Sequence, residues 1–156
     1  MRKRAILVAV ANGAEEIETV TIVDVLRRAG ATVTLAKAGS IGSDLKCQMS
    51  RGMSITADAL LRDEAVLQTK YDAIVLPGGL EGAKTLAKEK LLLGKIALQM
   101  KEHRLVAAIC AAPVFVLANN NLLNNVPKAV CHPTVIDNIE NEAIRNKFLR
   151  SPKEHE

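Results

Sequence analysis

The sequence predicts a flavodoxin-like, three-layer α/β sandwich, in which helices cover both faces of a mostly parallel sheet. Short apolar runs alternate along the chain with segments whose apolar residues have helical spacing. The strand-like runs are apolar throughout, which is typical of strands buried on both faces. The chain has 156 residues, and 49% of them are apolar. That is enough for one globular core without disulfides or metal ions.

A strand–helix–strand unit is expected at the amino end of the chain. Residues 4–10 and residues 32–37 form apolar runs typical of buried strands. Residues 16–28 between them are expected to form a helix that ends before Gly30, a favourable residue just past a helix end. Four apolar side chains at helical spacing are expected to face inward: Ile17, Val20, Val23 and Leu26.

The rest of the chain repeats this pattern. We expect a small hairpin over 47–56 around Arg51 and Gly52, a short helix over 63–68, strands over 72–77, 105–109 and 129–131, and helices over 86–103, 112–118 and 137–150. Gly94 is a candidate interruption of the helix over 86–103. Pro113 fits a first helical turn, because the N–H that proline lacks has no intrahelical partner there.

Charge and aromatic content argue against a nucleic-acid partner. The net charge is +4, and the segment 84–104 alone holds six basic and two acidic residues. Proteins that stack on bases need aromatic platforms, and this chain has only Tyr71, Phe115 and Phe148. A solvated helix face is therefore the preferred interpretation of the basic segment.

The composition also indicates where the chain works. The longest apolar run, residues 105–118, has 14 residues, short of the ~20 that cross a bilayer. Polar residues rather than a cleavage site follow the first apolar run, so we expect no secretory signal. Three cysteines are an odd number without a disulfide framework, which favours free thiols in a reducing compartment. We expect the cytoplasm, with the nucleus or mitochondrion as alternatives, and no membrane partner.

Cys110 is the strongest candidate for a catalytic residue. It ends an apolar strand and precedes a helix, so its side chain is expected on a tight turn with the geometry of a nucleophile elbow. The amides at a helix N-terminus stabilise a thiolate, and thiols placed there can have pKa values of ~3.5–7.5. The alternative is a buried cysteine that only packs in the core.

Other candidates follow the neighbouring strands, at the sheet edge where such folds bind ligands. Glu18 is expected to turn toward the thiol, whereas Glu15 and Glu16 are expected to have better access to water; all three could instead complement the helix dipole. Gly78 and Gly79 could direct amides at an oxyanion, or could form a plain tight turn.

His132 lies 22 residues beyond Cys110, a separation that allows a neighbouring strand end. A histidine there could move protons or raise the nucleophilicity of the thiolate; the alternative is an ordinary loop histidine. Cys47 and Cys131 are expected to be peripheral redox thiols. Cys131 beside His132 hints at a metal pair, but no further Cys/His cluster supports one, so we expect no metal.

Four segments, taken in order and spacing, resemble the ThiJ/PfpI superfamily and within it the Parkinson-disease protein deglycase branch. They are residues 13–20 (GAEEIETV), 75–79 (VLPGG), 107–113 (AAICAAP) and 131–133 (CHP). The resemblance implies a flavodoxin-like homodimer without a cofactor. It also implies Cys110 as nucleophile, Glu18 as a protonated carboxyl bonded to its sulfur, His132 nearby, and the Gly79 and Ala111 amides as an oxyanion hole.

The same resemblance implies an activity. It is glyoxalase III-type conversion of methylglyoxal into lactate, or deglycation of glycated groups, with protection against oxidative stress through oxidation of the same cysteine. A non-enzymatic redox sensor or chaperone that uses Cys110 oxidation is the alternative. A glutamine amidotransferase would need His-x-Glu, but Pro133 and Thr134 follow His132; a dinucleotide enzyme would need Gly-x-Gly-x-x-Gly after the first strand, where residues 12–15 read NGAE.

The carboxyl end departs from the superfamily pattern. Members continue past the His-Pro segment with another strand, a loop near the cysteine and a long closing helix. Here the segment over 137–150 is expected to be one polar helix and 151–156 a tail, so we divide the chain into a ThiJ/PfpI-like domain over 1–136 and a divergent helix and tail over 137–156. Apolar sheet surface should be uncovered, and the chain should be less stable and aggregate more readily than a full-length relative.

Overall fold

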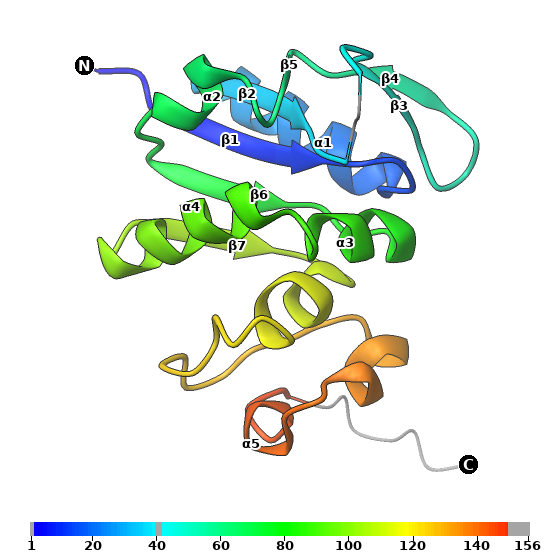
Figure 1. Cartoon of the computed structure of the whole chain (residues 1–156), viewed down its shortest axis with the longest axis vertical. Coiled ribbons are helices and arrows are strands. Elements are labelled where there is room, and N and C mark those ends of the chain that lie inside the picture. Colours follow the sequence, from blue (N-terminus) through cyan, green and yellow to red (C-terminus); the bar gives the residue numbers. More distant parts are fainter. Residues whose placement is uncertain (1, 40–41, 150–156) are drawn as a thin grey trace.

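The computed structural model describes residues 2–39 and 42–149, and it contains the expected parallel sheet. Five strands pair in the order β5-β2-β1-β6-β7, all in parallel (Figure 1). They are β1 (Ala5–Val10), β2 (Thr32–Lys37), β5 (Ala59–Leu60), β6 (Ala73–Leu76) and β7 (Leu105–Ala108). The prediction of a mostly parallel α/β fold is confirmed.

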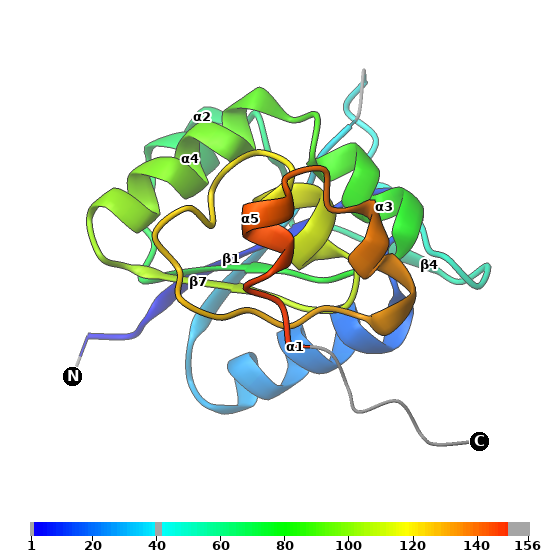
Figure 2. The ribbon, with the colours of Figure 1, turned by 90° about the horizontal axis from the view of Figure 1, so that it is seen from below.

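Helices cover the two faces of this sheet unequally. Figure 2 shows α1 (Glu16–Arg28) on one side, and α2 (Glu64–Gln68), α3 (Leu80–Leu86) and α4 (Lys90–Lys101) on the other. The segment over 86–103 is largely helical, as expected, but the interruption is a turn over 87–89, which separates α3 from α4 and lets both Leu86 and Leu92 be fully buried. Gly94 lies inside α4 without interrupting it. In the described part of the chain, no helix is long and apolar enough to span a bilayer.

Strand alternation divides the core into two layers. Ile6, Val8 and Val10 of β1 face the α1 side, together with Val33 and Leu35 of β2. The intervening residues face the opposite layer, which contains the other helices and most of the large buried side chains: Leu7, Ile74, Leu76, Leu86, Leu92 and Ile96. The central strands are therefore apolar throughout because both of their faces are buried.

Helix α1 has the predicted bounds but a different orientation about its axis. Ile17 and Val20 were expected to face inward, yet they are 74% and 47% exposed. The buried positions of the helix are Glu16 and Thr19, and Val23 and Leu26 are partly buried against the α1-side core. Because apolar residues occur all around this helix, spacing alone does not define the buried face.

The small hairpin is confirmed as β3 (Lys46–Gln48) paired in antiparallel fashion with β4 (Ser54–Thr56). Cys47 in β3 is fully buried in the α1-side core. The Gly13 amide donates a 2.7 Å hydrogen bond to the Gln48 carbonyl, and the Ser50 amide donates a 2.9 Å bond to the Ala14 carbonyl. The hairpin is thus held against the loop that follows β1.

The carboxyl third folds only partly as predicted, because the helix expected over 112–118 forms over residues 113–118 but the segments after it differ. The helix after β7 is a π-helix, η1 (Pro113–Ala118), followed much later by a 3₁₀ helix, η2 (Pro133–Asn138), and by α5 (Glu142–Arg145). The expected helix over 137–150 is wrong as far as residue 149, and Arg150 lies outside the described residues. The segment does not form one continuous helix, because the Asn141 side chain accepts a 3.3 Å hydrogen bond from the Ile144 amide and so begins a new helix. Segment 129–131 is not a regular strand either, since only Ala129 forms a bridge, to Phe148.

Three apolar residues of this carboxyl segment, Ile139, Ile144 and Phe148, are buried in the layer that contains η1. They therefore do not cover the other face of β7, where Leu105 is 63% and Ile109 48% exposed. Leu105 pairs with Ala73, which faces α1, so these side chains lie on the α1 side of the sheet edge.

We expect the double substitution Leu105→Thr and Ile109→Thr to reduce binding of a hydrophobic dye and to slow aggregation. Exposed apolar patches bind such dyes, and threonine suits a half-exposed strand. The free energy of unfolding should change by no more than ~0.5 kcal/mol, as is usual for surface positions. Leu98→Gln on α4, where Leu98 is 50% exposed, is the matched control. Equal dye binding by the double variant and the wild type would show that this patch is already covered.

Candidate active site

The strongest candidate residues meet at the carboxyl ends of three adjacent strands. Cys110 follows β7, Gly78 and Gly79 follow β6, and Glu18 belongs to the helix that begins after β1. Cys110 has a positive φ of 60°, a conformation that costs energy for any residue with a side chain. Such a strained turn between a strand and a helix is the geometry of a nucleophile elbow.

Gly78 packs directly between the cysteine and Glu18. Its amide donates a 2.6 Å hydrogen bond to Glu18 Oε2. A Cβ atom at this position would lie 2.6 Å from Cys110 Cβ and 2.8 Å from Glu18 Oε2, so only glycine leaves the two functional side chains in place. The Gly-Gly pair is therefore more than a plain turn.

The Cys110 thiol lies in a mixed electrostatic environment. Burial raises its pKa above the usual range, and the Gly79 and Ala111 amides, as hydrogen-bond donors to the sulfur, lower it. The Glu18 carboxylate raises the pKa of Cys110 further, through its charge and as a hydrogen-bond partner of the thiol. The net direction is upward. The expectation of a lowered pKa is thus wrong for a charged Glu18, because burial and the carboxylate outweigh the two amides.

The three glutamates at the start of α1 have different roles. Glu15 caps α1, accepting a 2.7 Å hydrogen bond from the Glu18 amide. Glu16 was expected to have access to water but is buried, and its carboxylate accepts bonds from Ser50 Oγ at 2.8 Å and from the Arg51 amide at 2.5 Å. It therefore fixes the hairpin turn beside the site. Of the three, Glu18 is the one that acts on the cysteine.

His132 is held next to the cysteine through its backbone. Its amide donates a 2.9 Å hydrogen bond to the Cys110 carbonyl. Its ring Nδ1 lies 2.9 Å from Thr134 Oγ1 and accepts a 3.3 Å bond from the Thr134 amide, which places the proton of the neutral ring on Nε2. The side chain is exposed, so Nε2 is the atom left to meet a ligand.

Two hollows meet at Cys110. The first, of about 380 Å³, is lined by residues from both predicted and unpredicted segments: Glu15, Ser50, Arg51, Gly79, Leu80, Cys110, Ala111, His132, Thr134 and Val135. The sequence did not single out Ser50, Arg51, Leu80, Thr134 or Val135. Of these residues, only Ser50 and Arg51 belong to a feature that the sequence predicted, and that feature was a hairpin rather than part of a binding site. The volume suits a small ligand.

The second hollow, of about 390 Å³, lies on the other side of the cysteine. Its lining includes Glu18, Cys110, Cys131 and His132. Cys131 thus lies at the site, whereas Cys47 is buried in the α1-side core. Within residues 2–39 and 42–149, no three histidine, cysteine or acidic side chains gather in a way that could hold a metal ion.

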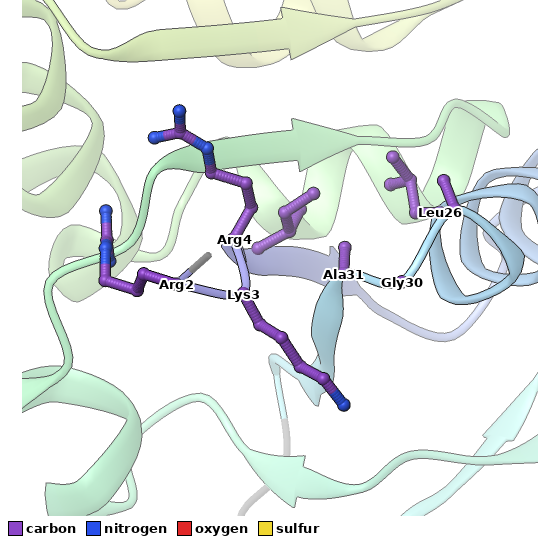
Figure 3. Close-up of a pocket in the computed structure, with 8 residues that line it drawn as sticks. Arg2, Lys3, Arg4, Leu26, Gly30 and Ala31 are labelled. Carbon is purple, nitrogen blue, oxygen red and sulfur yellow. The ribbon is translucent and has the colours of Figure 1, made fainter.

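A larger hollow, of about 630 Å³, lies at the opposite end of the sheet, between residues 2–4 and the end of α1 (Figure 3). Figure 3 shows that Arg2, Lys3 and Arg4 spread in different directions rather than converging on one point. Asp72 lies 2.6 Å from Arg2 and 3.4 Å from Arg4, and so compensates part of their charge. Without a nucleophile, and at the amino ends of the strands, this hollow is a poor candidate for catalysis.

We expect Cys110 to be alkylated before the other two cysteines when the folded protein is treated with limiting iodoacetamide. Burial raises the pKa of all three thiols, but only at Cys110 do two backbone amides act in the opposite direction and stabilise the thiolate, and Cys47 is in addition fully buried. Peptide mapping after short labelling provides the order. Preferential labelling of Cys47 or Cys131 in folded protein would contradict the expectation, and denatured protein, in which all three should react alike, is the control.

The sequence of this chain is similar to those of several known proteins. Residues 4–148 match the model of the DJ-1/PfpI family. The chain is 46% identical over 117 residues to the Parkinson disease protein 7 homolog of Danio rerio, covering 75% of this chain and 59% of that protein. It is 35% identical over 136 residues to the glutathione-independent glyoxalase DJR-1.2 of Caenorhabditis elegans, covering 87% and 68%.

Solved structures agree in fold. The crystal structure of Drosophila melanogaster DJ-1beta superimposes with a TM-score of 0.82 at 32% identity, covering 97% of this chain and 76% of that one. The alignments include most of this chain but a smaller share of each relative. The chain spans only 34% and 30% of the length of the DJ-1 homologs A and B of Arabidopsis thaliana.

Proposed function

The chain belongs to the DJ-1/PfpI family, and from this premise we propose that it is a cofactor-independent cysteine enzyme of the glyoxalase III type. The observation that carries the proposal is Cys110 on its strained turn, with two amides and one carboxyl group directed at its sulfur. The substrates are methylglyoxal and related 2-oxoaldehydes, with glycated groups as a second class. One relative is named a glutathione-independent glyoxalase, which supports this choice.

The first step forms a covalent bond between enzyme and substrate. The Cys110 thiolate attacks the aldehyde carbon of methylglyoxal, a C–S bond forms, and the carbonyl π electrons become an oxyanion. The Gly79 and Ala111 amides donate hydrogen bonds to that oxyanion, and one such donor contributes on the order of 10²–10³ in rate. Protonation by the Glu18 carboxyl group or by His132 completes a hemithioacetal.

The second step is an internal redox reaction. A proton leaves the former aldehyde carbon and a proton is added at the neighbouring carbonyl carbon, so one carbon is oxidised to a thioester and the other is reduced to an alcohol. Glu18 and His132 Nε2 are the groups placed to carry these protons. Water then hydrolyses the thioester, which releases lactate and restores the thiol. The sum is methylglyoxal plus water giving lactate.

The Glu18–Cys110 pair supplies the reactive thiolate. A thiolate beside a carboxylate is disfavoured, so the two groups share one proton, and the reactive arrangement has that proton on Glu18. The Gly78 amide fixes Glu18 Oε2 and leaves the other oxygen of the carboxyl group for the sulfur.

A second copy of the chain is the proposed protein partner. Ile17 and Val20 lie three residues apart on α1, so they share one exposed face of that helix. Pairing of this face in a homodimer would bury apolar surface that the monomer leaves in water. The cytoplasm remains our proposed location.

Lactate formation without glutathione is the test of the proposed function. Purified protein, with its oligomeric state recorded by light scattering, should convert a large molar excess of methylglyoxal into lactate at a steady rate. Loss of the aldehyde with labelling of Cys110 but without lactate would favour the redox-sensor alternative. Heat-denatured protein corrects for scavenging by surface amines.

We expect Glu18→Gln to shift the pH at which Cys110 becomes alkylated to lower values. Gln is close in shape and can still accept the bond from the Gly78 amide, but it lacks the charge that raises the pKa of the cysteine. Alkylation rates from pH 6 to 10 measure the shift. Glu18→Asp, shorter by one methylene group, should lengthen the contact and change the peroxide product of Cys110. An unchanged profile and an unchanged product would show that Glu18 does not contact the sulfur.

A further inference from the structure

A second thiol faces the reactive cysteine, and the proposed reaction does not use it. Cys131 lines the same hollow as Cys110 and Glu18. Both thiols are free and partly exposed, whereas Cys47 is fully buried on the other side of the sheet. Cys110 and Cys131 are therefore the two thiols that one small oxidant can reach in one place.

The backbone holds these two cysteines close together. The amide after Cys131, that of His132, donates a 2.9 Å hydrogen bond to the carbonyl of Cys110. A bond of this length holds the Cα atoms of residues 110 and 131, each of which adjoins one of the two bonded peptide groups, within roughly 8 Å of each other. Disulfides join Cα atoms that are roughly 4.4–6.8 Å apart, so little movement is needed to link residues 110 and 131.

The side chains also interact electrostatically. After burial, the charge of Cys110 is the factor that raises the pKa of the Cys131 thiol, which indicates that the two sulfur atoms lie near each other. The negative charge of a Cys110 thiolate therefore favours the protonated form of Cys131. Glu18, in the same hollow, is placed to accept the proton of Cys131 when that thiol attacks.

We propose that Cys131 is the resolving thiol for Cys110, and that the two form an intramolecular disulfide when a peroxide oxidises the site. In the first step the Cys110 thiolate attacks one peroxide oxygen, the O–O bond breaks, and Cys110 becomes a sulfenic acid while hydroxide takes up a proton as water. In the second step the Cys131 sulfur attacks the Cys110 sulfur and the S–O bond breaks. Glu18, which gave its proton to the hydroxide of the first step, takes the proton of Cys131 and passes it to the leaving hydroxyl group, which departs as a second water. A thiol reductant restores both thiols.

This inference rests on the proposed function only in that Cys110 is the reactive thiol of the site. The disulfide would reversibly inactivate the site. The disulfide occupies the nucleophile, and it removes the sulfenic acid before further peroxide converts it into the sulfinic acid, which thiols do not reduce.

Peptide mapping of peroxide-treated protein is the test. Trypsin places Cys110 in residues 105–128, Cys131 in 129–145 and Cys47 in 47–51, so each cysteine has its own peptide. After treatment with a molar excess of hydrogen peroxide and blocking of free thiols, wild type and Cys47→Ser should give peptide 105–128 joined to 129–145. Cys131→Ser should instead give peptide 105–128 with two added oxygens, in roughly tenfold greater yield than wild type. Cys131→Ala serves as the second variant if the serine variant does not fold.

The outcomes separate this inference from the proposed function, because the mapping does not depend on turnover. A sulfinic acid at Cys110 in equal yield with and without Cys131, a link to Cys47, or a link between two copies of the chain at low protein concentration would overturn the resolving role. A linked peptide in protein that makes no lactate would support the resolving role and overturn the proposed enzyme activity. Lactate formation without any linked peptide would support the proposed enzyme activity and overturn the resolving role of Cys131.

Discussion

Cys110→Ser is expected to abolish lactate formation and to leave the fold intact. Serine has nearly the same size as cysteine and can occupy the same turn. Its hydroxyl group stays protonated at neutral pH, so the variant has no anionic nucleophile in place of the thiolate. Removal of a nucleophile typically lowers kcat by on the order of 10³-fold or more, because the remaining oxyanion contacts and proton carriers cannot form the covalent intermediate.

The control for this variant is Cys47→Ala. Cys47 is buried in the α1-side core, away from the hollows at Cys110, so its loss should lower stability modestly and leave turnover in place. Lactate formation and far-UV circular dichroism, measured on both variants, separate chemistry from folding. Substantial turnover by Cys110→Ser would exclude covalent catalysis at this cysteine.

The sequence predicted the parts of the fold that depend on long apolar runs. The strands over 4–10, 32–37 and 72–77 form because few structures other than a doubly covered parallel sheet bury such runs, and the run over 105–109 forms the edge strand beside β6 although one of its faces is exposed. The strand ends then brought Cys110, Gly78 and Glu18 together, since the carboxyl ends of adjacent parallel strands meet at one edge.

The sequence could not predict features that depend on tertiary contacts. The rotation of α1 follows from Glu16, whose carboxylate is bound by Ser50 and by the Arg51 amide, a contact 35 residues away. The carboxyl segment was assigned as one helix because local propensity does not show that Asn141 caps a new one. The direction of the pKa of Cys110 depends on burial and on Glu18, neither of which a helix-terminus argument includes.

Gly79→Ala is expected to be the most destabilising single change at the site. Gly79 has a φ of +84° and a ψ of 122°, a sparsely populated conformation that an L-residue adopts at a cost of roughly 1–3 kcal/mol. A Cβ atom there would lie 2.3 Å from the Gly13 carbonyl oxygen and 2.6 Å from the Glu15 nitrogen. These are backbone atoms of a loop already joined to Gly78, whose carbonyl accepts a 3.1 Å bond from the Glu15 amide, so the clash cannot be relieved by a side-chain rotation.

Overpacking of this kind costs about 1–3 kcal/mol in addition to the backbone strain. The sum approaches the whole stability of a marginal domain, which is roughly 5–15 kcal/mol. Urea unfolding should therefore show a large loss for Gly79→Ala. Any variant that still folds should lose activity, because the Gly79 amide moves away from the sulfur. Gly94→Ala is the matched control, since Gly94 lies inside α4 with no atom within 4 Å of an added Cβ, and alanine favours a helix by about 1 kcal/mol over glycine. The two alanines should thus change stability in opposite directions, and equal unfolding midpoints would show that the loop after β1 can yield to a side chain at Gly79.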